Sequence, residues 1–163
     1  MESANSDSDP RAVAKVRQAA EAAGLAVRIA LMPSSTRTAE DAAAACGCDV
    51  GQIVKSLVFR GKATGRPILL LVSGRNRVDT AKVAAVIGEA LDRPDAGFVR
   101  AVTGYAIGGI PPIGHDTPMT AYLDTDLLAY PEVFAAAGTP NAIMAVSPAA
   151  LSKAAAAIET KVT

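Results

Sequence analysis

The stretch QIVKSLVF, residues 52–59, places a lysine in the middle of an apolar segment. Its β-branched and aromatic residues predict a strand, and side chains two positions apart on a strand share one face. Lys55 therefore lies on the face that also carries Ile53, Leu57 and Phe59. Burying an ammonium group is costly unless it has a partner or a wet pocket. Lys55 is thus either a functional residue or one whose stem reaches the surface or a buried carboxylate.

A second unusual segment is the apolar loop TGYAIGGIPPIG, residues 103–114. Ordinary loops are polar. This loop offers mainly backbone groups, because glycine lets a ligand approach the main chain and proline stiffens it. Such N–H groups can bind a carbonyl oxygen or stabilise developing negative charge, although the loop could also be a plain structural turn. With Lys55 it predicts a pocket with one positive charge and a backbone wall, suited to an anionic or ester-bearing small group.

Length and composition indicate a single folded domain. A chain of 163 residues fits one domain, and half of its residues are hydrophobic, so a full core needs no disulfides. No apolar run approaches the roughly 20 residues that cross a membrane. The polar and acidic residues at the N-terminus lack the apolar stretch of a signal peptide. We therefore expect a disordered tail over residues 1–10, a folded domain over 11–163 and a cytoplasmic location.

The formal net charge is zero, but the charge is unevenly distributed. Residues 51–100 carry nine Lys and Arg against four Asp and Glu, whereas residues 101–163 carry two against five. A basic surface for nucleic acid could therefore come only from the middle of the chain. The alternative is a solvated edge of the sheet. The candidate basic residues are Arg60, Lys62, Arg66, Arg75 and Arg77.

The order of predicted elements mixes hairpins with helices, which is typical of an α+β fold with a mixed sheet. Helices are predicted over 11–23, over 39–46 after Thr38 as N-cap, over 79–88 with Asp79 as N-cap, over 94–103 with Pro94 in its first turn, and from Pro148 onward. Strands are predicted over 26–31, 52–60, 67–72, near 91, and over 119–124, 133–136 and 142–146.

Few side chains outside these segments indicate chemistry. His115 is the only histidine, so a Ser-His-Asp site would have to use it. Asp124 and Asp126 are interpreted first as a capping pair and only weakly as metal ligands. Cys46 and Cys48 form neither a disulfide framework nor a four-ligand zinc site.

Several segments together resemble the YbaK-type aminoacyl-tRNA editing domains. The matching segments are TAEDAA at 38–43, GQIVKSLVF at 51–59, TGY at 103–105 with GGIPP at 108–112, and AGTPNA at 137–142. The resemblance implies an α+β domain with a mixed, largely antiparallel, barrel-like sheet surrounded by helices. It also implies hydrolysis of a mischarged aminoacyl-tRNA, typically tRNA for proline carrying a small non-cognate amino acid. A water molecule or a substrate hydroxyl would be the nucleophile, without metal or other cofactor.

The resemblance assigns roles to particular residues. Lys55 would hold the terminal adenosine and the ester, and Gly108 would place backbone amides near the ester carbonyl. The candidate substrate-binding residues are Thr38, Gly109, Ile110, Pro112, His115, Gly138, Thr139 and Asn141. Thr38 could instead only cap a helix, and Asn141 could only begin a strand. Members specific for cysteine have a Ser-Gly-Gly type segment near 136–138, where this chain has AAG, so the amino acid removed stays open.

The expected partners are the acceptor end of aminoacyl-tRNA and, as a candidate, prolyl-tRNA synthetase, with the protein itself a monomer or weak dimer. The alternative is a non-catalytic module of the same fold that binds the tRNA end or a synthetase. A weaker third interpretation is a small-molecule ester or amide hydrolase that uses His115.

Overall fold

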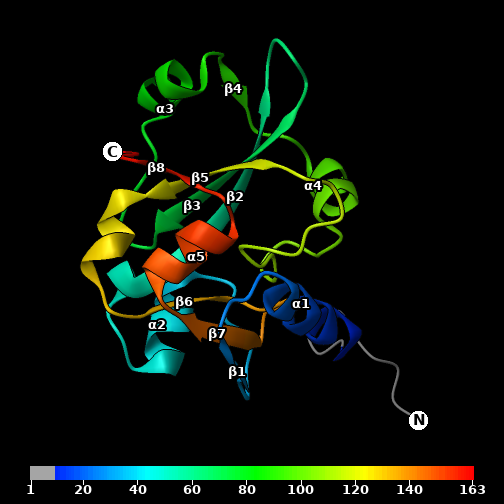
Figure 1. The fold of residues 1–163 in the computed structure, drawn as a ribbon, viewed down its shortest axis with the longest axis vertical. Coiled ribbons are helices and arrows are strands. Elements are labelled where there is room, and N and C mark those ends of the chain that lie inside the picture. Colours follow the sequence, from blue (N-terminus) through cyan, green and yellow to red (C-terminus); the bar gives the residue numbers. More distant parts are fainter. Residues whose placement is uncertain (1–9) are drawn as a thin grey trace.

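The computed structural model describes residues 10–163 (Figure 1). Pro10, expected in the tail, begins the first helix, and the rest of the predicted tail lies outside the described residues. The helices are α1 (Pro10–Ala22), α2 (Ala39–Cys46), α3 (Thr80–Ile87), α4 (Ala96–Thr103) and α5 (Pro148–Ala154), and the 3₁₀ turns are η1 (Val50–Gln52) and η2 (Thr125–Ala129). The predicted helices are thus confirmed, with bounds shifted by a few residues.

Within residues 10–163 the strands form one eight-stranded sheet. They are β1 (Arg28–Leu31), β2 (Ile53–Gly61), β3 (Pro67–Ser73), β4 (Leu91–Asp92), β5 (Thr120–Asp124), β6 (Val133–Ala136), β7 (Ala142–Val146) and β8 (Ile158–Thr160). The order is β1-β7-β6-β2-β3-β5-β8, with β4 on β2. Most neighbours are antiparallel, while the β2–β6, β3–β5 and β5–β8 pairs are parallel. The α+β class with a mixed, mostly antiparallel sheet is confirmed, and in hydrogen-bonded order the sheet ends at β1 and β8.

The β2–β3 hairpin is the centre of the sheet, and β3 is buried on both faces. Leu69 and Leu71 pack into a large core with α1 and α5, whereas Ile68, Leu70 and Val72 pack against α3. This explains the uninterrupted apolar run of β3, because a strand covered on both sides has no polar face. The expected alternation in β2 holds as well. Val54 and Val58 contact the large core, and Leu57 and Phe59 contact the core beneath α3.

Side-chain caps set the helix boundaries. Thr38 accepts a hydrogen bond from the Asp41 amide at the start of α2, and Asp79 accepts one from the Lys82 amide at the start of α3, both as predicted. The prediction that Pro94 begins α4 was wrong. Asp95 is the N-cap and accepts from the Phe98 amide at 2.8 Å, so Pro94 lies outside the helix.

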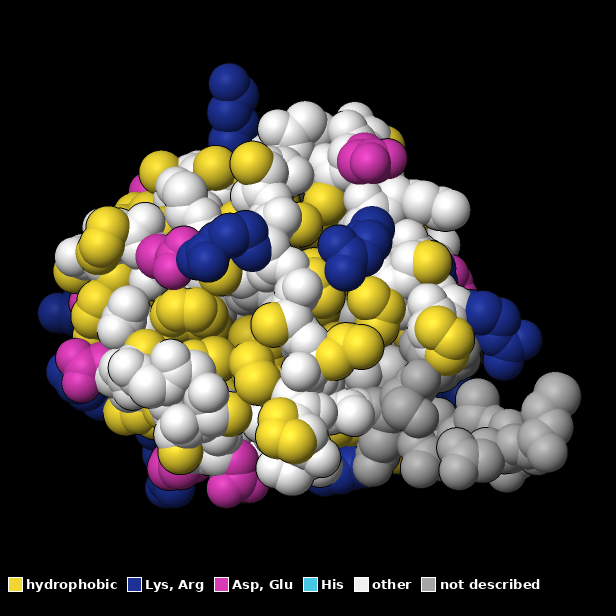
Figure 2. All heavy atoms as spheres, turned by 90° about the horizontal axis from the view of Figure 1, so that it is seen from below, with side chains coloured by type: hydrophobic (Ala, Val, Ile, Leu, Met, Phe, Trp, Pro, Cys, Tyr) yellow, Lys and Arg dark blue, Asp and Glu magenta, His cyan; other side chains and the backbone are white. Residues whose placement is uncertain are grey.

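Two further features bear on the outer surface. The edge strand β1, at the lower end of Figure 1, leaves the Leu31 side chain 72% exposed. Viewed from that end, apolar side chains occupy much of the surface between separate Lys and Arg groups (Figure 2). The outer edge of β1 has no strand partner within residues 10–163, and the monomer or weak dimer expected from the sequence stays a prediction. No helix within residues 10–163 is long and apolar enough to cross a membrane.

Candidate functional site

The two edges of β2 have different neighbours. On one edge β3 pairs with every residue from Val54 to Arg60. On the other edge β6 pairs only with Ile53 and Val54, and β4 only with Arg60 and Gly61. Over the described part of the chain, residues 55–59 therefore have no strand partner on that second edge. The interruption leaves room for a pocket beside the middle of the strand.

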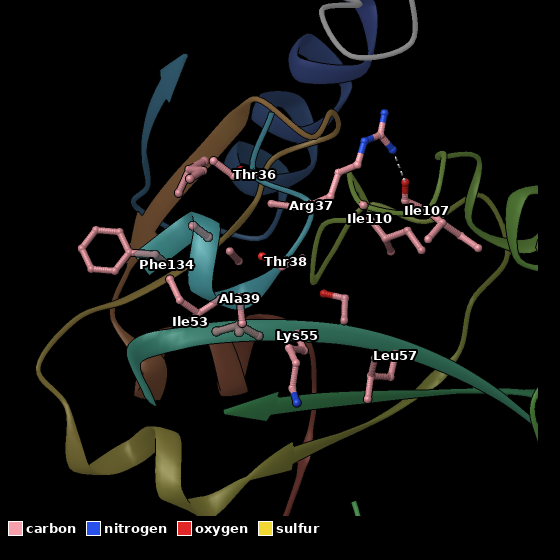
Figure 3. A pocket seen from close by; sticks show the side chains of 17 residues that line it. Thr36, Arg37, Thr38, Ala39, Ile53, Lys55, Leu57, Ile107, Ile110 and Phe134 are labelled. Atoms are coloured by element: carbon pink, nitrogen blue, oxygen red, sulfur yellow. Dashed lines mark hydrogen bonds between the residues drawn. The ribbon is translucent and has the colours of Figure 1, made fainter. Parts of the chain in front are cut away.

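A pocket of about 290 Å³ lies at this interrupted edge, and we call it the apolar pocket. Its walls come from α2, β2, β6 and the loop that follows α4 (Figure 3). Nearly all of the side chains that line it are hydrophobic or small. They are Thr36, Arg37, Thr38, Ala39, Ala42, Ile53, Val54, Lys55, Ser56, Leu57, Ile107, Gly108, Ile110, Phe134, Ala135, Ala136 and Ile143.

A second pocket of about 550 Å³ adjoins it, and we call it the basic pocket. It is formed largely by the loop between β3 and α3. Three arginines and Lys55 line it against a single carboxylate, which favours an anionic ligand. Its lining residues are Glu40, Lys55, Leu57, Gly74, Arg75, Asn76, Arg77, Val78, Thr80 and Arg93.

Lys55 belongs to the walls of both pockets. Its side chain extends to the same side of β2 as Leu57, whereas Thr38 and Ile110 lie on the other side (Figure 3). Its ammonium donates a hydrogen bond to the Asn76 carbonyl oxygen at 2.6 Å. Burial lowers the pKa of Lys55 from its ordinary value, Arg77 and Arg93 lower it further, and Glu40 and Asp124 oppose the shift. The charge is therefore held by a single carbonyl and by surrounding charges, at the junction of the two pockets.

A buried carboxylate fixes the loop that carries this carbonyl. Asp124 is fully buried and accepts hydrogen bonds from the Ser73 amide at 3.1 Å and from the Asn76 side-chain amide at 2.8 Å. The Asn76 side chain also donates to Asp126 at 2.7 Å. Asp124 in addition caps η2 by accepting from the Asp126 amide, which confirms the capping interpretation. The two aspartates thus position Asn76, and through it the Lys55 ammonium.

The glycine-rich loop forms the wall of the apolar pocket opposite Lys55. Gly108 lies in the left-handed region with a φ of 95° and lines the pocket with Ile107 and Ile110. Gly109 is behind it, where a Cβ would lie 2.7 Å from the Thr139 Cα. The Gly138 amide donates to the Gly109 carbonyl at 3.0 Å. Backbone packing between the two loops therefore requires glycine at position 109.

The structure brings some of the predicted site residues to the pocket and leaves others behind it. Thr38 lines the apolar pocket and caps α2 as well. Pro112, Gly138 and Thr139 are buried and line neither pocket. The Asn141 carbonyl accepts from the Met32 amide at 2.6 Å, while its side chain accepts from the Thr139 hydroxyl at 3.3 Å. Gly138 and Thr139 pack against Gly109 and thus support the glycine-rich loop from outside the pocket walls.

His115 lines neither pocket. Its Nε2 lies 2.7 Å from the Pro111 carbonyl oxygen, and burial lowers its pKa. Cys46 and Cys48 are part-buried free thiols, and burial together with Cys48 raises the pKa of Cys46 to about 11. Residues 10–163 hold no group of three side chains that could bind a metal ion. None of these side chains adds a reactive group to the two pockets.

The basic middle of the chain divides into two groups. Arg75 and Arg77 line the basic pocket. Lys62 lies 3.6 Å from Asp92, Arg66 lies 3.2 Å from Glu89, and the Arg60 guanidinium stacks on the Phe98 ring. The structure adds Arg93, which sequence reasoning did not single out because it lies far from Arg77 along the chain. It also adds Ser56, which lies in the wall of the apolar pocket. The residue type of Ser56 alone did not indicate a role in the site.

Comparisons with known proteins agree with this geometry. The model of the family called aminoacyl-tRNA editing domain matches residues 33–154. The uncharacterized protein YwhH of Bacillus subtilis is 32% identical over 120 residues, covering 74% of this chain and 76% of that protein. EbsC of Enterococcus faecalis, provisionally named a Cys-tRNA(Pro)/Cys-tRNA(Cys) deacylase, is 31% identical over 118 residues, covering 70% of each chain.

A solved structure shows the same fold. It belongs to a protein described provisionally as a trans-editing enzyme for prolyl tRNA synthetase, with 46% identity, a TM-score of 0.89, and coverage of 96% of this chain and 99% of that one. The family match covers most of the folded domain and includes β2, Lys55 and the glycine-rich loop. This chain therefore belongs to the aminoacyl-tRNA editing domain family.

Proposed function

We propose that this protein is a trans-editing hydrolase that deacylates mischarged aminoacyl-tRNA, with tRNA for proline carrying a small non-cognate amino acid as its substrate. The observation that carries the proposal is that Lys55 lies in the walls of both an apolar and a basic pocket. An aminoacyl-tRNA end has the matching parts: a small side chain, an ester, and a nucleotide with phosphate.

The apolar pocket suits the amino acid. Its volume of about 290 Å³ is at the lower end of the roughly 300–1,000 Å³ typical of ligand pockets. The rigid loop at Gly108 and Ile110 forms one wall, so the pocket acts as a size filter. Such a second site is needed because a synthetase pocket separates side chains that differ by one methylene only about 10–200-fold.

The basic pocket suits the terminal nucleotide. Arg75, Arg77 and Arg93 present guanidinium groups that pair with phosphate oxygens. Lys55 then holds the ribose and the ester by charge-assisted hydrogen bonds. A water molecule attacks the ester carbonyl carbon, either directly or after a ribose hydroxyl of the substrate has first taken over the aminoacyl group. The bond from that carbon to the ribose oxygen breaks, and the proton given up by the water passes to the ribose oxygen. The free amino acid and uncharged tRNA then leave.

The test is deacylation of tRNA for proline charged in turn with Ala, Ser, Cys, Thr and Pro. We expect turnover of one or more small non-cognate esters and survival of the prolyl ester. Binding of the charged tRNAs without turnover of any ester would overturn the hydrolase and support the non-catalytic module. Association with prolyl-tRNA synthetase is tested by adding the synthetase to the same assay.

A further inference from the structure

The backbone of Ser56 faces the unpaired edge of β2. The Gly74 amide donates to the Ile53 carbonyl, and the Gly61 amide donates to the Arg66 carbonyl, so odd-numbered residues of β2 direct their backbone groups toward β3. Successive residues of a strand point these groups to opposite edges. Ser56 and Val58 therefore direct N–H and C=O toward the edge that neither β6 nor β4 covers.

The side chain of Ser56 is unusual as well. Its hydroxyl oxygen is a buried side-chain polar atom that has no hydrogen-bond partner within the described residues. Buried polar groups are nearly always paired in folded proteins, and an exception calls for a reason. Ser56 also lines the apolar pocket. One residue of the pocket wall thus offers an N–H, a C=O and a hydroxyl beside a mainly hydrophobic space.

We propose that the aminoacyl group of the substrate binds to Ser56 as a strand of a single residue, a proposal that rests on the function proposed above. The α-amino group donates to the Ser56 carbonyl oxygen. The ester carbonyl oxygen accepts from the Ser56 N–H and from its hydroxyl. This is the arrangement of a hydrogen-bonded pair in an antiparallel sheet, where two facing residues exchange both bonds.

The dimensions of the site favour one amino acid over a longer peptide. Only Ser56 and Val58 face the gap between β6 and β4, and the pocket there is small, at about 290 Å³. Charge sets the direction of binding. The cationic groups of the basic pocket hold the phosphate, so the ribose oxygen of the ester points toward Lys55 and the amino acid extends along the Ser56 edge.

The arrangement makes Ser56 a catalytic residue. Hydrolysis places negative charge on the ester carbonyl oxygen, and two donors from one residue then stabilise it in a pocket of low polarity. Rotation about χ1 lets the hydroxyl reach an oxygen held by the neighbouring N–H. The pairing also requires a free α-amino group, because an acyl group on that nitrogen would occupy the space beside the strand.

The direct test follows amide hydrogen exchange by NMR. The probe is 3′-amino-3′-deoxyadenosine carrying an L-alanyl group in amide linkage, and its N-acetyl derivative is the control. At saturation the free-amine probe should slow exchange of the Ser56 amide by about 10-fold or more, since that amide gains a hydrogen bond. The Leu57 amide faces β3 and should not change. No binding of the probe, or an unchanged Ser56 amide at saturation, would overturn the proposal.

Kinetics separate this proposal from the proposed function. Ser56→Ala should lower kcat by about 10- to 100-fold with little change in KM, and Ser56→Thr, which keeps the hydroxyl, should restore it. The melting temperature of Ser56→Ala should not fall, because the hydroxyl that it removes has no partner. Unchanged kcat would overturn the catalytic role of the Ser56 hydroxyl while leaving the hydrolase intact. A probe that protects Ser56 in a protein that hydrolyses no ester would overturn the hydrolase instead and leave the pairing standing.

Discussion

The two pockets beside β2 share Lys55 and Leu57 but differ in size and in the rest of their lining. The apolar pocket is smaller and, apart from Arg37 and Lys55, is lined by hydrophobic and small side chains, whereas the basic pocket is larger and carries three arginines. The difference shows how one strand can separate two kinds of recognition. Side chains on opposite faces of β2 contact different cores, so the amino acid and the nucleotide of a substrate can be selected by different parts of the fold.

The largest effect is expected where the pockets meet. Lys55→Ala should lower kcat/KM for the edited ester by about 100-fold or more, because it removes the charged donor shared by both pockets. The measurement is single-turnover deacylation, with circular dichroism to confirm folding. The control is Lys153→Ala, since Lys153 is exposed on α5 and lines neither pocket. Full turnover by folded Lys55→Ala would remove Lys55 from the mechanism.

The wall of the apolar pocket can be disturbed without touching the basic pocket. Gly109→Ala would place its Cβ 2.7 Å from the Thr139 Cα and 2.9 Å from the Gly138 oxygen. Both are backbone atoms that cannot easily move, so we expect the free energy of unfolding to fall by about 1–3 kcal/mol. Gly97→Ala in α4 is the control, because its Cβ would make only an ordinary contact. The free energies of unfolding are measured in urea. Equal values for the two variants would contradict the close packing of Gly109 against Gly138 and Thr139.

The basic pocket should affect tRNA binding rather than chemistry. Arg75→Gln with Arg77→Gln is expected to raise KM several-fold and to lower the salt slope of binding by about 0.7 for each phosphate group that the variant no longer binds. Arg17→Gln on the exposed face of α1 is the matched control. The measurement is the Kd of uncharged tRNA at several salt concentrations. A slope unchanged from wild type would mean that phosphate binds elsewhere.

The pKa of Lys55 predicts a modest change in the pH profile. Burial lowers this pKa from its ordinary value, and the protonated form is the active one. Activity should therefore fall as pH rises through the lowered pKa, at a lower pH than an ordinary lysine with a pKa of about 10.4 would require. Lys55→Arg should move the decline beyond the measured range. Rates are to be corrected for spontaneous ester hydrolysis, and a profile that is flat to high pH in the wild type would contradict this role.

Local sequence signals predicted most of the fold. Caps at Thr38 and Asp79, the apolar run of β3 and the period-two pattern of β2 are short-range features, and the structure confirms the elements that they predict. Pro94 was misassigned because a proline near a helix start fits more than one position, and the Asp95 cap decided the boundary. Strand β8 was missed because its three residues acquire their role only by pairing with β5.

The site was predictable in part. Lys55 could be singled out because its charge interrupts an apolar strand pattern. Gly108 could be singled out because it lies in a loop that is unusually apolar and rich in glycine and proline. Ser56 could not be singled out in this way, since a serine in a strand is common. It becomes a candidate only when the structure shows that one edge of β2 has no strand partner at this position. No sequence pattern indicated Arg93 either, because only the folding of the segment after α3 brings it to the basic pocket. Properties that depend on which edge remains unpaired require the three-dimensional structure.

The separation of the two pockets is tested most directly by amino acid selectivity. The measurement is the ratio of kcat/KM for threonyl to seryl esters of the same tRNA, which differ by one methyl group. Ile110→Val, which enlarges the apolar pocket, should raise this ratio several-fold, within the roughly 10–200-fold limit for one methylene. Ile113→Val, equally buried but outside the pocket, and Arg77→Gln should leave it unchanged. A ratio that shifts with Arg77→Gln and not with Ile110→Val would contradict the account.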